Sequence, residues 1–109
     1  MVKELLDALN IKNREARFLS PPKSGTYAVW FDSFESRGAD DLNLLRDHDY
    51  MIELYEYTPD PKTEREIEAA LDQLGIGYTK LNRFFLESEQ LYQVIYEFSK
   101  LEKGGLYYV

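Results

Sequence analysis

The sequence predicts an α+β fold in the order α-β-β-α-β-β, with a mainly antiparallel four-stranded sheet and two helices packed on one of its faces. Two tyrosine-rich runs, 50–57 and 91–98, alternate with the period of two that is typical of half-buried strands. Between them, residues 61–74 have the apolar spacing and the end signals of a helix. Because two helices cannot cover both faces of such a sheet, the uncovered face is expected to be polar or to meet a partner.

The first half of the chain is expected to hold a helix, a connector and a strand. Apolar residues recur at helical spacing over 2–12, which predicts an amphipathic helix that docks on the sheet. Consecutive prolines and a glycine at 20–25 break the pattern and indicate a connector or an irregular edge segment. Residues 26–34 are rich in aromatic and β-branched side chains, which favours a strand. The polar link that follows, 35–49, is longer than a tight hairpin needs, and such links tend to be functional or mobile.

The strand at 50–57 is predicted to have two unlike faces. Its apolar face, Tyr50, Ile52 and Leu54, is expected to pack against the core. The other face is mixed and available for contacts, with Met51, Glu53, Tyr55 and Tyr57.

The helix at 61–74 has signals at both ends. Asp60 can cap it, Pro61 suits its first position, Glu64 suits its positive end, and Gly75 suits a left-handed stop.

Two further strands are expected after this helix, at 78–86 and 91–101, joined by the polar turn 87–90. Residues 106–109 are then either a frayed tail or a small docking segment.

Size and composition predict one domain over residues 1–109, because this length allows one hydrophobic core and not two. Thirteen basic and 20 acidic residues leave a net charge of −7, which disfavours binding to nucleic acid. The absence of cysteine excludes disulfides, thiolate metal sites and cysteine nucleophiles. The N-terminus lacks the apolar run of a signal peptide, and no stretch is long and apolar enough to span a membrane. We therefore expect synthesis in a cytoplasm and no membrane association.

No catalytic, cofactor-binding or metal-ligating residue is predicted. His48 lies between Asp47 and Asp49, but alternation along a strand sends it to the opposite face, so we interpret it as a surface residue at a strand entrance. The aspartates at 32, 40, 41, 47 and 49 have no spacing that fixes a metal geometry. Gly75 and Gly77 end a helix, whereas phosphate-binding loops begin one.

Tyrosine is the residue type with the clearest interface signal. Nine tyrosines offer large amphipathic contact areas of the kind enriched where proteins pack on one another. Core packing explains most of them; Tyr55, Tyr57 and either Tyr107 or Tyr108 are candidate interface residues.

The chain over about Thr26–Lys103 resembles the small tail-completion proteins of long-tailed bacteriophages, also called tail terminators or head–tail joining proteins. The resemblance rests on the segments Tyr27–Asp32, Arg37–Asp40, His48–Tyr55, Glu66–Leu71 and Glu89–Phe98.

This resemblance implies a protein without enzymatic activity or cofactor, located at the head–tail junction of a virion. It implies a hexameric ring on the tail tube that stops tube growth and meets the head connector, so its partners are the tail-tube protein, the connector and further copies of itself. DNA passes through such a ring without specific binding, and either the terminator or the joining role fits. We expect the long link, with Arg37, Asp40, Asp41 and Arg46, to contact other subunits or the connector.

Two other classes of function stay open at the level of sequence. An acidic inhibitor or DNA mimic that binds a basic host protein would use the same surplus of carboxylates. A metal-dependent enzyme would need the aspartates around His48 to converge.

Overall fold

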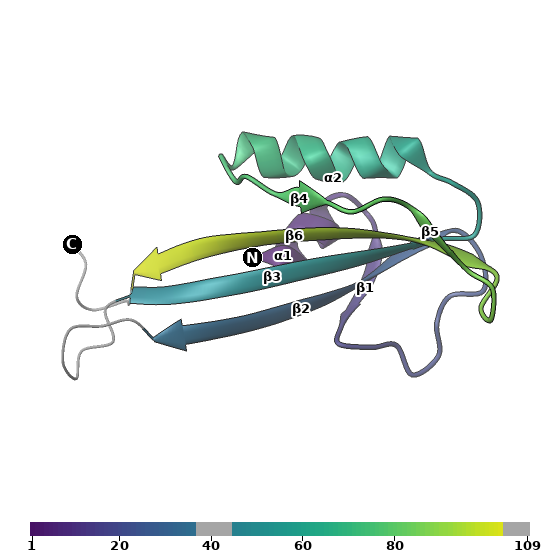
Figure 1. Cartoon of the computed structure of the whole chain (residues 1–109), viewed down its shortest axis with the longest axis horizontal. Helices are drawn as coiled ribbons and strands as arrows, with labels where there is room; N and C mark the ends of the chain where they lie inside the picture. The colour runs from purple at the N-terminus through teal and green to yellow at the C-terminus, as the bar shows by residue number, and fades with distance from the viewer. Residues whose placement is uncertain (37–44, 104–109) are drawn as a thin grey trace.

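The computed structural model describes the backbone of residues 1–36 and 45–103, and the side chains of residues 1–33 and 48–100. Two helices and six strands follow one another along the chain (Figure 1). Their bounds are α1 Val2–Ala8, β1 Lys12–Glu15, β2 Thr26–Ser36, β3 Leu45–Glu56, α2 Pro61–Gln73, β4 Thr79–Lys80, β5 Phe84–Leu86 and β6 Leu91–Lys103.

The strands form one mixed sheet in the order β1-β2-β3-β6-β4, and β5 also pairs with β6. The three long strands at its centre are antiparallel, with β3 paired to β2 from Thr26↔Glu56 to Ser36↔Arg46 and to β6 over its whole length. β4 and β5 pair with β6 in the antiparallel sense, whereas β1 runs parallel to β2. The expected sheet of four antiparallel strands is therefore the antiparallel part of a larger, mixed sheet.

One hydrophobic cluster joins both helices to one face of the sheet. In the three central strands this face consists of the even-numbered residues, and it includes Ile52 and Leu54 from β3, both fully buried. Buried apolar residues of α1 and α2 pack against it: Val2, Leu5, Leu6, Ile67 and Leu71. The predicted division of the 50–57 strand into a buried face and a mixed face is confirmed.

The helix α2 has the predicted boundaries to within one residue. The carboxylate of Asp60 accepts hydrogen bonds from the backbone N–H and the hydroxyl of Thr63, which satisfies an N–H group that the first helical turn leaves unpaired. Gly75 follows the last turn with φ of +71°, the left-handed conformation that glycine adopts at least cost.

Three predicted elements are wrong in their bounds. The helix at 2–12 ends at Ala8, because the chain turns at Asn10 with φ of +60° and enters β1. The link at 35–49 is shorter, because β2 continues to Ser36 and β3 begins at Leu45. The strand at 78–86 is two short strands, β4 and β5, interrupted at 81–83.

The helices of the described ranges are too short or too polar to cross a membrane. Residues 106–109, expected to be a tail or docking segment, lie outside the part of the chain that the structure describes.

Candidate functional site

The sheet face opposite the helices carries the odd-numbered residues of the three central strands, and the connector after β1 covers one end of it. The ring of Phe18 packs edge-on against Tyr27 at 5.3 Å between centroids, and Tyr27 stacks on Tyr55 at 5.2 Å. The hydroxyl of Tyr57 donates a hydrogen bond to the carbonyl oxygen of Pro22 at 2.9 Å. The connector therefore covers much of this end of the face, and a small depression of about 230 Å³ remains between it and the strands.

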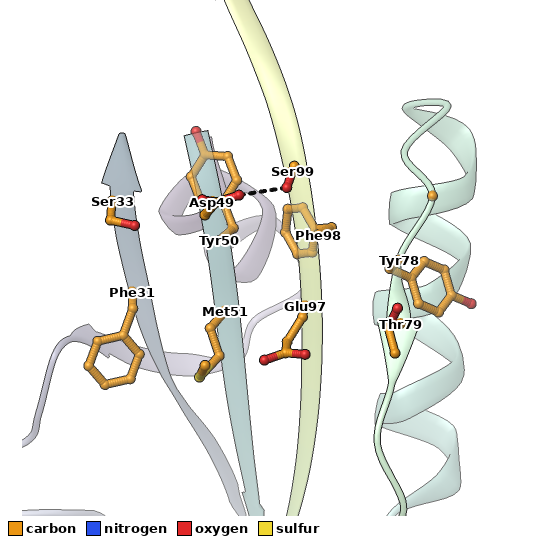
Figure 2. A pocket seen from close by; sticks show the side chains of 11 residues that line it. Phe31, Ser33, Asp49, Tyr50, Met51, Tyr78, Thr79, Glu97, Phe98 and Ser99 are labelled. Carbon is orange, nitrogen blue, oxygen red and sulfur yellow. Dashed lines mark hydrogen bonds between the residues drawn. The ribbon is translucent and has the colours of Figure 1, made fainter. Parts of the chain in front are cut away.

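The other end of the same face is uncovered and hollowed (Figure 2). Cross-strand register places its side chains in two rows. Ser33, Asp49 and Ser99 face one another in a polar row, and the Ser99 hydroxyl donates to the Asp49 carboxylate at 2.7 Å. The second row contains Phe31, Met51 and Glu97.

We call this depression, centred on Phe31, Met51, Asp49 and Glu97, the acidic hollow. It has a volume of about 730 Å³ and reaches the sheet edge at Thr79 of β4. Its charged lining residues are two carboxylates, and its full lining is Phe31, Ser33, Asp49, Tyr50, Met51, Gly77, Tyr78, Thr79, Glu97, Phe98 and Ser99. Phe31 is 38% exposed, so the hollow presents a large apolar side chain to solvent. Apolar side chains lie next to carboxylates in this depression, a combination that suits contact with another protein.

A second depression of about 400 Å³ lies beside the opposite edge of the sheet, after β1. It is lined by Arg14, Arg17, Phe18, Leu19 and Ser20, and we call it the basic hollow. The guanidinium of Arg14 lies over the Phe18 ring, 5.5 Å from its centroid, and Leu19 is 87% exposed. Cationic and apolar groups are therefore presented together at this edge.

The third concentration of polar groups is a buried ionic cluster between α2 and the sheet. Glu56 ends β3 with no exposed surface, and Glu64 from α2 is 3% exposed. Arg83, in the segment between β4 and β5, donates to both carboxylates. Lys80 donates to Glu64 at 3.0 Å and to Glu68 at 2.7 Å.

The two buried carboxyls of this ionic cluster have opposite pKa shifts. Burial and the neighbouring Glu64 carboxylate raise the pKa of Glu56 to about 7. Burial also opposes ionisation of Glu64, but its interaction with the neighbouring Glu56 and the hydrogen bonds from Lys80 and Arg83 outweigh burial and lower its pKa. Of the two carboxyls, Glu56 is therefore the one that stays protonated to higher pH.

The structure describes some of the predicted interface residues and not others. Arg37, Asp40 and Asp41 lie outside the described residues, and Arg46 is placed only by its backbone, on β3 opposite Ser36 and Glu102. Tyr55 lies on the mixed face as predicted but is half-buried, and its hydroxyl donates to Glu53 at 2.8 Å. Burial, and next the hydrogen bond to Glu53, raise the pKa of Tyr55 to about 12. Tyr57 is 36% exposed and tied to the connector through Pro22.

The interpretation of His48 as a surface residue is wrong. Its Nδ1 lies 2.8 Å from the Asp32 carboxylate, its ring stacks on Tyr50, and only 7% of the residue is exposed. The reason is the early start of β3, which places His48 inside the strand and on the face that the helices cover. Asp49 lies on the opposite face, as predicted, and the part of the chain with described side chains contains no group of three or more residues suited to hold a metal ion.

Sequence reasoning missed the two hollows and the ionic cluster. Alternation alone assigns Phe31 and Met51 to their faces, but the rows exist only through the register between strands. The sequence signal for the basic hollow was the grouping of Lys12, Arg14 and Arg17, the closest spacing of basic residues in the chain.

Comparison with known proteins identifies a likeness in structure. The chain is similar to a protein chain of the solved structure "Virion of native gene transfer agent (GTA) particle", with a TM-score of 0.52 over 92% of this chain and 84% of that chain. The likeness is one of fold. The two sequences are 16% identical, and neither a family model nor a curated protein matches this sequence.

Proposed function

We propose that this protein is a structural component of a phage or phage-like virion. The observation that carries the proposal is the fold shared with a chain of a gene transfer agent virion, which extends over 92% of this protein. It agrees with the resemblance of the sequence to tail-completion proteins, which rests on residue segments and not on the structure.

In its finer form, the proposal places the protein at the head–tail junction, as a hexameric ring that caps the tail tube and contacts the head connector. Cyclic rings are built from heterologous contacts, in which one patch of a subunit meets a different patch of the next. The acidic and basic hollows are two such unlike patches. With −7 per subunit, the ring would also repel the backbone of DNA that passes through it.

The residues proposed for contacts with other subunits or with the connector remain Arg37, Asp40, Asp41 and Arg46. In the sequence they fall in or beside the segment that connects β2, which ends at Ser36, to β3, which begins at Leu45. Connections between elements are disproportionately places where proteins bind partners. Charge reversals at Arg37 and Asp40 that leave head–tail joining intact would remove this part of the proposal.

The deciding experiment deletes the gene from its phage or prophage and images the particles by electron microscopy. Loss of a tail terminator gives overlong tails, whereas loss of a joining protein gives tails of normal length and unattached heads. The wild-type gene supplied in trans is the control and should restore whole particles. Normal, infectious particles from the deletion strain would contradict the proposal and turn attention to the acidic inhibitor of a basic host protein.

A further inference from the structure

The acidic hollow has chemical features of a site that is covered in an assembly. Two apolar side chains, Phe31 and Met51, lie in one row with Glu97, and Asp49 lies in the next row. The carboxylate of Glu97 forms no hydrogen bond or ion pair with the described side chains, and Asp49 accepts one hydrogen bond, from Ser99. A fitting occupant therefore brings an apolar side chain together with cationic donors.

The basic hollow of the same chain offers that combination. Leu19, at 87%, is more exposed than any other large apolar side chain among the described residues. Arg14 and Arg17 flank it, and neither pairs with a carboxylate in the part of the chain whose side chains are described. Arginine is well suited to such a contact, because its planar group binds carboxylates in a forked geometry and is weakly hydrated.

The two hollows cannot meet within one copy. The acidic hollow reaches the β4 edge of the sheet, and the basic hollow follows β1, which forms the other edge. A second copy placed beside the first can bring its basic hollow to the first copy's acidic hollow. The contact joins unlike patches, so it repeats from copy to copy and closes into a ring where the rotation allows it.

We propose that the basic hollow of one copy docks in the acidic hollow of the next, with Leu19 against Phe31 and Met51 and with Arg17 beside Glu97. Only the closure of this contact into a ring rests on the proposed function. Its formation between free copies depends on the charges and apolar groups of the two hollows alone.

The test uses the purified full chain and a charge swap, followed by sedimentation velocity at concentrations up to about 1 mM, where even a weak contact of millimolar Kd is visible. Glu97→Arg alone places arginine against Arg17, and Arg17→Glu alone places glutamate against Glu97, so each should weaken association about tenfold or more. An equimolar mixture of the two variants should associate again, because each contact in an alternating assembly then joins opposite charges. The double variant should associate by itself.

Matched controls separate this contact from general effects of charge. Lys23→Glu and Glu87→Arg make the same changes at exposed positions outside both hollows and should leave association as in the wild type. Leu19→Ser should weaken association, and Leu74→Ser, at a position 57% exposed, should not. Circular dichroism and Tm confirm that each variant is folded.

Three results would overturn the contact: a wild-type chain that stays monomeric at about 1 mM, single swaps that associate normally, or a mixture that fails to associate although both variants are folded. The outcome is independent of the deletion experiment. Normal particles in the deletion strain would contradict the virion role but would not bear on the contact between copies. Overlong tails together with a monomeric protein would support the virion role and contradict the contact.

Discussion

At the scale of single residues, the most unusual group is Glu56, a carboxyl without exposed surface next to a second buried carboxyl, Glu64. Arg83 joins the two, so the cluster holds one cation between two acids and a further cation, Lys80, at its rim. Burying these charged groups costs solvation free energy. A buried ion pair offsets that cost only when all of its hydrogen bonds are formed. One oxygen of Glu56, Oε2, is buried without a hydrogen-bond partner among the described groups, so ionising this carboxyl would leave part of its charge unpaired.

Glu56→Gln should therefore change how stability depends on pH. The pKa of Glu56 is about 7 in the folded protein and near 4.5 when unfolded, so the stabilisation from its protonation is full below pH 4.5 and is lost as the pH rises through about 7. Glutamine keeps an oxygen for Arg83 and never ionises. Urea unfolding between pH 5 and pH 8 should show the variant gaining free energy of unfolding relative to wild type as the pH rises.

Glu87→Gln, at an exposed turn position, is the control for this pH series and should follow the wild type throughout. The lowered pKa of Glu64 does not interfere, because its contribution is lost only as the pH falls below about 4.5. Curves for Glu56→Gln and wild type that run parallel from pH 5 to pH 8 would show that Glu56 is ionised in the folded protein.

At the scale of elements, the sequence predicted those helices and strands whose signals lie within a few residues of one another. The capped helix α2 and the alternating strands β3 and β6 were predicted because Asp60, Gly75 and the period of two act within a few residues. β1 was missed because its sequence, Lys-Asn-Arg-Glu, has no apolar alternation, and its strand conformation comes from a parallel ladder with β2. The burial of His48 and the two hollows likewise depend on the length and register of strands, which no local pattern encodes.

The side chain of Asn13 holds β1 in place, and its loss should be costly. Its amide nitrogen donates to Asp7 and to the carbonyl of Ile11, and its oxygen accepts from the indole of Trp30. Asp7 is exposed and keeps its hydrogen bond from Lys3, but Asn13→Ala removes a partner from the carbonyl of buried Ile11 and from the half-buried indole of Trp30, so we expect a loss of about 1–3 kcal/mol in the free energy of unfolding. Lys12→Ala, an exposed neighbour on the same strand, should cost about 0.5 kcal/mol or less.

Urea unfolding followed by the fluorescence of Trp30, the single tryptophan of the chain, measures both of these variants directly. Equal midpoints for Asn13→Ala and Lys12→Ala would mean that β1 is held by its backbone ladder alone.

At the scale of the whole molecule, both helices and the sheet share one core. Leu6 of α1 is fully buried in the same cluster as Ile67 of α2 and Tyr96 of β6. No element of the cluster can leave without exposing the apolar side chains of the others. Unfolding is therefore expected to be a single cooperative transition, as in most small domains.

Leu6→Ala should lower the stability of this whole unit and not release α1 alone. The expected loss is about 2–5 kcal/mol, the range for removing a buried leucine side chain. Helix content by circular dichroism and the fluorescence of Trp30 in β2 should report the same, lower midpoint. A helical signal that is lost before the fluorescence changes would instead indicate that α1 unfolds independently.

The placement of β3 between β2 and β6 has a consequence for biosynthesis. β2 and β3 can pair as soon as both have left the ribosome, but β6 follows only after α2, β4 and β5. Until β6 emerges, β3 is an edge strand whose apolar face lacks half of its neighbours, and such edges pair readily with other chains. The nascent chain thus passes through an interval in which its central strand is exposed. That interval ends when β6 has been translated and pairs with β3.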